Sequence, residues 1–210
     1  KVFLSLLSIW IWLWRMLRTV GRVGFPIYCF LLVEGFLHTR DWRRYWLRMA
    51  AFALISEIPF RLAVWNTWAG GSSNVYVELA IGLLVLRGLK QSEGLTQPRR
   101  AAGMAAVIGG GCLAAVFLKA DYDMDGILII SLFYLLREKR IVQVMSGGIL
   151  SLLESWNMCY GAGILSAVPL YFYNGKKGQA PWKYAFYWFY PLHLMVLFFI
   201  RLYVVGIPLG

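Results

Sequence analysis

Residues that can carry out acid–base chemistry interrupt stretches of sequence that are otherwise almost wholly apolar. Glu34 and His38 lie four positions apart, which places them on one face of a helix. His193 follows Tyr190 within the last and most aromatic stretch. An imidazole can accept a proton near neutral pH, and a neighbouring carboxylate can orient and stabilise the charged ring. Glu34, His38 and His193 are therefore the candidate catalytic residues, and either histidine could be the base.

A second group of charged and phenolic side chains lies in or beside the same apolar stretches. Glu57 and Arg61 share the four-residue spacing, and Pro59 between them favours a kink. Taken singly, such residues are more often ion pairs or hydrogen-bonded packing residues than functional groups. Taken together they predict a polar cavity, because ionisable groups within a membrane usually face a cavity or a partner. The predicted cavity-lining or acceptor-binding residues are Arg18, Arg22, Glu57, Arg61, Glu78, Asp121, Tyr122 and Tyr190.

A short acidic turn places Asp121, Asp123 and Asp125 within five residues. The spacing is similar to that of a calcium loop, but the downstream glutamate that would complete such a loop is absent. The three cysteines form no CxxC pair. We therefore expect no metal site. Most acidic turns only solvate a helix end, although this one could also attract a cationic group such as a peptide amine.

The elements that must position these residues are apolar helices. Of the 210 residues, 60% are hydrophobic and 15% charged, against roughly half and about a quarter in a soluble domain. Lipid cannot satisfy free backbone groups, so apolar blocks in a membrane must be helical. The sequence predicts an all-α, polytopic membrane bundle with about nine helical segments, forming a single domain over residues 1–210. The blocks are 2–14, 24–37, 49–65, 75–86, 101–118, 126–136, 141–153, 160–173 and 184–205.

The distribution of positive charge predicts how the helices cross the membrane. The net charge is +11, and the basic residues cluster after the second, fourth, sixth and eighth blocks. The loops after the third, fifth and seventh blocks contain a single basic residue, Lys119. Cytoplasmic loops carry an excess of Lys and Arg, so the basic turns are predicted to be cytoplasmic and nucleic acid is not an expected partner. Arg15, Arg18 and Arg22 break the pattern between the first two blocks, as an interfacial turn or as a cationic stripe lining a cavity.

Four stretches, taken in order, resemble the TraX family, which is associated with N-terminal acetylation of pilin in conjugation. The stretches are Phe25-Pro26 followed by LLVEGFLHTR at 31–40, FALISEIPF at 52–60, Ala120-Asp121-Tyr122 with Gly126, and FYPLHL at 189–194. Family members usually open with an Asp-His-Ile-Gly element that nothing in residues 1–14 matches. We expect that residues preceding Lys1 are missing and that any such element lies among them.

The resemblance implies a bacterial inner-membrane acyltransferase. It would move an acetyl or other short acyl group from acyl-coenzyme A to an amine or hydroxyl of a peptide, pilin or glycan. Acyl-coenzyme A would be a co-substrate and no cofactor would be bound permanently. Arg40, Arg43 and Arg44 are the predicted donor-binding residues, because guanidinium groups bind phosphates bidentately. A small-solute transporter and a non-catalytic membrane scaffold are the alternatives, and the sequence does not indicate an oligomeric state.

Overall fold

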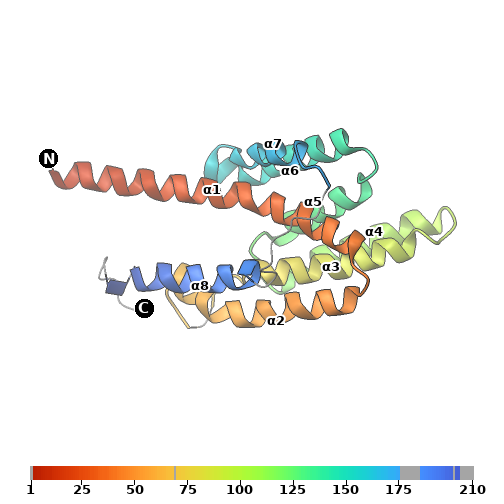
Figure 1. The fold of residues 1–210 in the computed structure, drawn as a ribbon, viewed down its shortest axis with the longest axis horizontal. Helices are drawn as coiled ribbons and strands as arrows, with labels where there is room; N and C mark the ends of the chain where they lie inside the picture. Colours follow the sequence, from red (N-terminus) through yellow and green to blue (C-terminus); the bar gives the residue numbers. More distant parts are fainter. Residues whose placement is uncertain (1, 69, 176–184, 201, 204–210) are drawn as a thin grey trace. The chain divides into compact units, whose positions relative to one another are not determined.

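The computed structural model describes residues 2–68, 70–175, 185–200 and 202–203. This part of the chain contains eight α-helices, one π-helical turn and one 3-10 turn, and no strand (Figure 1). The all-α class is therefore confirmed. The elements are α1 (Val2–His38), α2 (Trp42–Phe60), η1 (Arg61–Trp65), α3 (Val75–Ser92), α4 (Arg99–Phe117), α5 (Asp123–Leu135), α6 (Arg140–Cys159), η2 (Ala162–Ser166), α7 (Ala167–Tyr171) and α8 (Ala185–Ile200).

The first two predicted segments form one helix. α1 runs without a break for 37 residues, about 55 Å at 1.5 Å per residue. The division into separate segments at 2–14 and 24–37 is therefore wrong, and so is the interpretation of Arg15, Arg18 and Arg22 as a turn between them. Arginine interrupts an apolar pattern, but it is a good helix former, so the backbone continues through it. Pro26 also lies inside α1.

The contacts of the chain group into two compact units. Unit 1 comprises Lys1–Gly35 and Leu128–Gly175, and unit 2 comprises Phe36–Ile127 and Lys176–Gly210. The assignment of the whole chain to a single domain stays a prediction.

In unit 2, α2, α3 and α4 form an antiparallel set. The Trp46 indole donates to the Ala80 carbonyl at 3.1 Å, joining α2 to α3. A Cβ on Gly88 of α3 would lie 2.7 Å from the Val107 side chain, so glycine allows α3 and α4 to approach closely. α8 packs along α2 and η1. The turns before α2 and after α3 consequently lie at one end of this set, and the loops before α3 and after α4 lie at the other.

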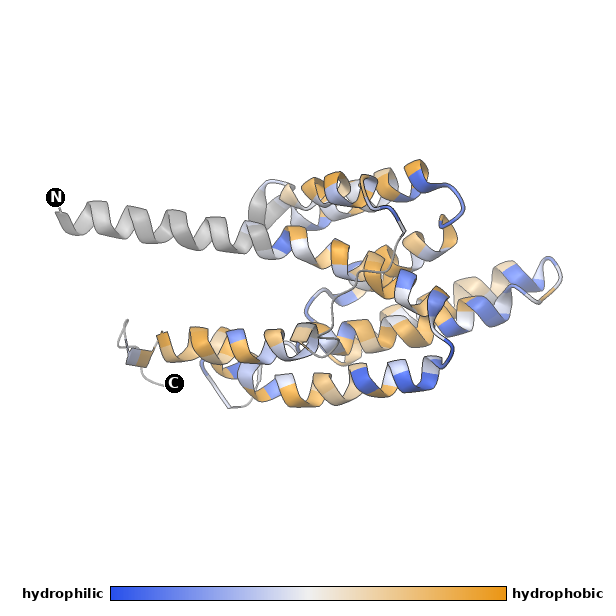
Figure 2. Cartoon of the chain, viewed as in Figure 1, coloured by the Kyte–Doolittle hydropathy of each residue, from blue (hydrophilic) through white to orange (hydrophobic). Residues whose placement is uncertain are grey.

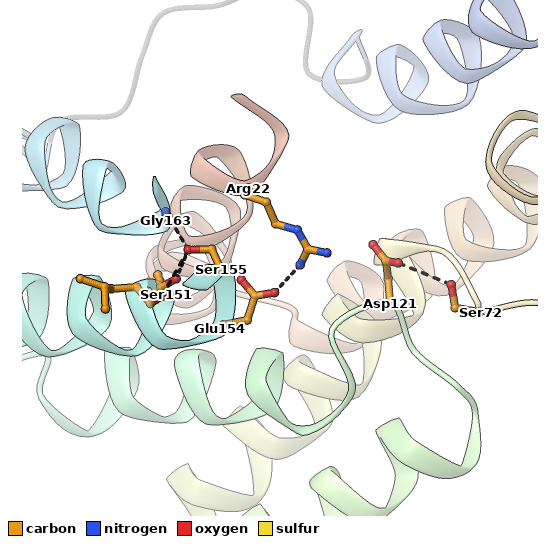
Figure 3. A network of polar contacts seen from close by, with 8 residues as sticks. Arg22, Ser72, Asp121, Ser151, Glu154, Ser155 and Gly163 are labelled. Atoms are coloured by element: carbon orange, nitrogen blue, oxygen red, sulfur yellow. Dashed lines mark hydrogen bonds and ion pairs between the residues drawn. The ribbon is translucent and has the colours of Figure 1, made fainter. Parts of the chain in front are cut away.

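In unit 1, the chain reverses its direction tightly after α6 and packs back on that helix. Tyr160 and Gly161 adopt left-handed backbone conformations, with φ of 52° and 75°, and η2 and α7 then pack on α6. The Gly163 amide donates to the Ser155 hydroxyl at 2.9 Å, which fixes the reversal (Figure 3). Arg140 donates from Nη2 to the carbonyl of Leu170 at 2.8 Å and so satisfies a backbone group at the end of α7.

Apolar residues make up much of the described helices (Figure 2), and many of their large side chains are exposed. In this part of the chain, α4 is the one helix that is both long and apolar enough to cross a bilayer, and shorter apolar stretches cover Ala162–Tyr171 and Tyr187–Ile200. Core helices of soluble proteins can also meet that criterion, but they are mostly buried, whereas α4 is largely exposed. Leu113 and Phe117 are 73% and 85% exposed. Lipid or another protein would have to cover such a surface.

Candidate functional site

The turn between α1 and α2 presents three exposed arginines. Asp41 is the N-cap of α2, and its Oδ1 accepts from the Arg44 amide at 3.1 Å. An aspartate at this position starts the helix immediately after the end of α1. Arg40, Arg43 and Arg44 are all exposed around this cap, as a donor-binding role requires.

The packing of α2 against α3 adds further cations at the same end. The Arg87 guanidinium lies 5.4 Å from the centre of the Trp42 ring, and the Lys90 ammonium lies 5.8 Å from that of Phe36. Arg48 lies 5.9 Å from the ring of Tyr45, on the same helix. We call this group the basic end of unit 2. Its members are Arg40, Arg43, Arg44, Arg48, Arg87 and Lys90.

Burial, with the Tyr187 hydroxyl as a second contribution, raises the pKa of the Tyr45 hydroxyl, while Arg48 partly opposes the rise. The phenol therefore stays neutral and does not offset the positive charge of the basic end. Arg48 belongs to the basic cluster that the sequence placed after the second block, whereas Arg87 and Lys90 were not predicted as site residues. The signal that could have found them is their place in the same predicted cytoplasmic loops.

The opposite end of α2 and α3 carries a hydrogen-bonded cluster around Asn74. Glu57 pairs with Arg61 at 2.8 Å and accepts from Asn74 Nδ2 at 2.6 Å. The same amide nitrogen donates to the Ala53 carbonyl at 2.7 Å, while Asn74 Oδ1 caps α3 by accepting from the Tyr76 amide at 3.0 Å. The Glu57–Arg61 pair was predicted from spacing, whereas Asn74 was missed. An Asn directly before an apolar helix is the signal that could have found it.

Two loops are joined beside this cluster. The Ser73 amide donates to the Lys119 carbonyl at 2.7 Å, and the Ser73 hydroxyl donates to the Leu118 carbonyl at 2.8 Å. The Ser72 hydroxyl donates to Asp121 Oδ1 over a longer 3.4 Å (Figure 3). The acidic turn is therefore held against the N-terminal end of α3.

Glu78 lies behind this turn and is fully buried, in the first turn of α3. Neither of its carboxylate oxygens has a hydrogen-bond partner. Gly126 packs against it, and a Cβ at Gly126 would lie 2.6 Å from Glu78 Oε1. The charged groups that act on Glu78 are Asp121, Asp123 and Asp125, all of them acids. We call this region the acidic end of unit 2. Its acids are Glu57, Glu78, Asp121, Asp123 and Asp125.

Tyrosines from α3 and α8 line the acidic end. The rings of Tyr76 and Tyr190 meet edge to face at 5.1 Å, and the Tyr76 hydroxyl donates to the Tyr187 carbonyl at 3.2 Å. Asp121 acts electrostatically on the Tyr190 hydroxyl. His193, one turn further along α8, has its Nδ1 3.0 Å from the Phe189 carbonyl. Because α8 packs on α2 and η1, the histidine lies toward the η1 end of α2.

The two candidate histidines are therefore far apart. His38 is exposed beside the start of α2, whereas His193 lies near its far end. Glu34 and His38 remain one turn apart on the continuous helix α1. A single catalytic site could therefore use His38 or His193, but not both. The catalytic role of either histidine, and that of Glu34, stays a prediction.

The predicted cavity residues do not all lie in one place. Glu57, Arg61, Glu78, Asp121, Tyr122 and Tyr190 all lie at the acidic end. Arg22 instead pairs with Glu154 within unit 1 (Figure 3), and the Arg18 side chain lies outside the described part. Among the described residues, no group of three His, Cys, Asp or Glu side chains could hold a metal ion.

Comparison with known proteins shows which family the chain is similar to. The family model described as "TraX protein" matches residues 4–201. The chain is also 30% identical over 218 residues to the "Probable fimbrial assembly protein FimC, serogroup H1" of Dichelobacter nodosus, covering 89% of this chain and 83% of that protein. No solved structure matches the chain. With a family match over nearly its whole length, the chain belongs to the TraX family.

Proposed function

We propose that this protein is a multi-pass inner-membrane acyltransferase that moves a short acyl group from acyl-coenzyme A to an amine or hydroxyl acceptor. Its membership of the TraX family and its similarity to a fimbrial assembly protein link it to the assembly of pili or fimbriae. A pilin is accordingly the acceptor that we favour. The observation that carries the proposal is the separation of opposite charges at the two ends of one helix set in unit 2.

The basic end suits the donor. Coenzyme A carries several phosphates, and the exposed guanidinium groups of Arg40, Arg43 and Arg44 supply planar donors that bind phosphate oxygens in pairs. Indole and phenol rings lie among these cations, with Trp42 next to Arg87. An aromatic surface beside cations also suits the adenine base, which can stack on it.

The acidic end suits the acceptor. The distance between the basic and acidic ends along α2 suits coenzyme A as the donor. Arg43 and Glu57 are fourteen residues apart on α2, about 21 Å along the helix. A donor held by its phosphates at one end needs a long flexible arm to bring its acyl group to the other. Coenzyme A has such an arm between its phosphates and its thioester. Acyl transfer would then join a cytoplasmic donor to an acceptor reached from the outer side.

The membrane location rests on exposure and charge together. α4 presents an almost continuous apolar surface, and the ends of the helices in unit 2 differ in charge as the positive-inside rule requires. The basic end would be cytoplasmic and the acidic end external.

Donor binding gives the direct test. Acetyl-coenzyme A is titrated into the detergent-purified protein, and Arg40→Ala is compared with Lys119→Ala, which removes an exposed cation from the opposite end. We expect Arg40→Ala to weaken binding by about tenfold, the loss of one charge-assisted contact, and Lys119→Ala to bind as the unaltered protein does. Equal affinities in all three proteins would mean that the basic end only orients the chain in the membrane.

A further inference from the structure

We infer that the acidic end of unit 2 binds a primary ammonium group, with Asp121 as its first contact and Glu78 as its buried counterion. The inference rests on the proposed function only in identifying the ammonium group as that of the acceptor. Binding itself requires no acyl donor and can be measured without one.

The first step is the state of Glu78. Its side chain is fully buried and neither carboxylate oxygen is hydrogen-bonded. The Tyr122 backbone amide acts on the carboxylate, but neither oxygen accepts a hydrogen bond. Burying a carboxylate without a partner is costly, and native structures rarely contain one. A cation that arrives from outside the chain would supply the partner that this carboxylate lacks.

The second step is the sign of that partner. Among the described residues, the charged side chains that act most strongly on Glu78 are the acids Asp121, Asp123 and Asp125. The nearby cation Arg61 is already bonded to Glu57 at 2.8 Å. A cation is therefore the ligand that this surface would stabilise most. A metal ion is disfavoured, because no group of three ligating side chains comes together in the described residues.

The third step is the size and type of the cation. Tyr76 and Tyr190 pack edge to face beside the acids, and aromatic rings attract ammonium groups. Gly126 packs directly against Glu78, so the space beside the carboxylate is narrow. A bulky, fully substituted ammonium group fits such a site poorly. A primary ammonium group is small and has three hydrogens to share between carboxylates and carbonyl oxygens.

The fourth step is the entrance. Asp121 is partly exposed, and its bond from Ser72 is 3.4 Å long. An ammonium group makes a shorter and stronger bond to a carboxylate than a neutral hydroxyl does. Replacing the Ser72 contact at Asp121 would bring the ammonium group into the turn that covers Glu78.

The experiment compares two peptides that differ only at the N-terminus. A tetra-alanine amide with a free amine and its N-acetylated form are titrated calorimetrically into the full-length protein in detergent, without acyl donor. We expect the free amine to bind at least tenfold more tightly. Glu78→Gln and Asp121→Asn should each remove most of this preference. Glu138→Gln, which alters an exposed acid of unit 1, should keep it.

A second arm tests a lipid as the source of the ammonium group. The protein is reconstituted in nanodiscs of phosphatidylethanolamine or phosphatidylcholine, whose headgroups carry primary and quaternary ammonium groups. Retention of phosphatidylethanolamine that Glu78→Gln abolishes would support the site with a lipid occupant. If Glu78→Gln does not fold, Asp121→Asn decides. Equal binding of both peptides together with no lipid preference would overturn the inference, as would an unaltered preference in the variants. Loss of acyl transfer alone would leave it standing.

Discussion

Asn74 is expected to contribute more to stability than any other polar residue at the acidic end. Its side chain is fully buried and makes three hydrogen bonds: to the Ala53 carbonyl, to Glu57 and from the Tyr76 amide. Asn74→Ala removes an N-cap, which costs about 1 kcal/mol. It also removes a hydrogen bond to a charged group, about 1.5–3 kcal/mol, and leaves the Ala53 carbonyl without this donor. Because such losses are not fully additive, we expect a total of about 3 kcal/mol.

The assay is thermal unfolding in detergent, followed by circular dichroism. For a chain of this length, about 3 kcal/mol corresponds to a fall in Tm of roughly 6–12 °C. Asn74→Ser is the matched variant, because serine can still cap α3 but cannot donate to both Ala53 and Glu57. Its Tm should lie between those of Asn74→Ala and the unaltered protein. A fall of less than about 2 °C for Asn74→Ala would mean that the three hydrogen bonds of Asn74 contribute little to stability.

Three further predictions follow from the same geometry. Gly126→Ala places a methyl group 2.6 Å from Glu78 Oε1, so it should destabilise the protein by about 1–3 kcal/mol. In a Glu78→Ala background this loss of stability should largely disappear. Thermal unfolding of the unaltered protein, the two single variants and the double variant checks this. A cysteine introduced at Ser72 should react with an impermeant thiol reagent from outside the cell. A cysteine introduced at Gly94 should react only after the membrane is opened, because the two positions lie at opposite ends of α3. The reverse pattern would contradict the proposed orientation. His38→Gln should leave Tm nearly unchanged, since the side chain is exposed, and should lower acyl-transfer turnover about a hundredfold if His38 is the base. Unchanged turnover would leave His193 as the candidate.

Two features of unit 2 could be predicted from the charge and the spacing of residues in the sequence. The four-residue spacing of Glu57 and Arg61 predicted their ion pair. The clustering of basic residues after alternate blocks predicted that Arg40 and Arg87 would lie at one end, and the antiparallel packing of α2 and α3 confirms it. Both features are local or follow from the alternating direction of successive helices.

The features that were missed depend on packing between distant residues. Glu78 and Gly126 are 48 positions apart, and no local signal indicates that the carboxylate lacks a partner. His38 and His193 looked equivalent as bases until the packing of α8 on α2 and η1 separated them. The break predicted within α1 came from equating a polar interruption with the end of a helix. Arginine changes hydropathy without ending helical hydrogen bonding.

Acyl transfer from coenzyme A is the activity that we propose for this protein. The most direct measurement uses full-length protein, including any residues that precede Lys1, in detergent or proteoliposomes with acetyl-coenzyme A labelled in the acetyl group and a peptide bearing a free N-terminal amine. We expect label to appear on the peptide while free coenzyme A accumulates in equal amount, and we expect Arg40→Ala to slow both. Release of neither product, with peptide, pilin or glycan acceptors alike, would contradict the proposed activity.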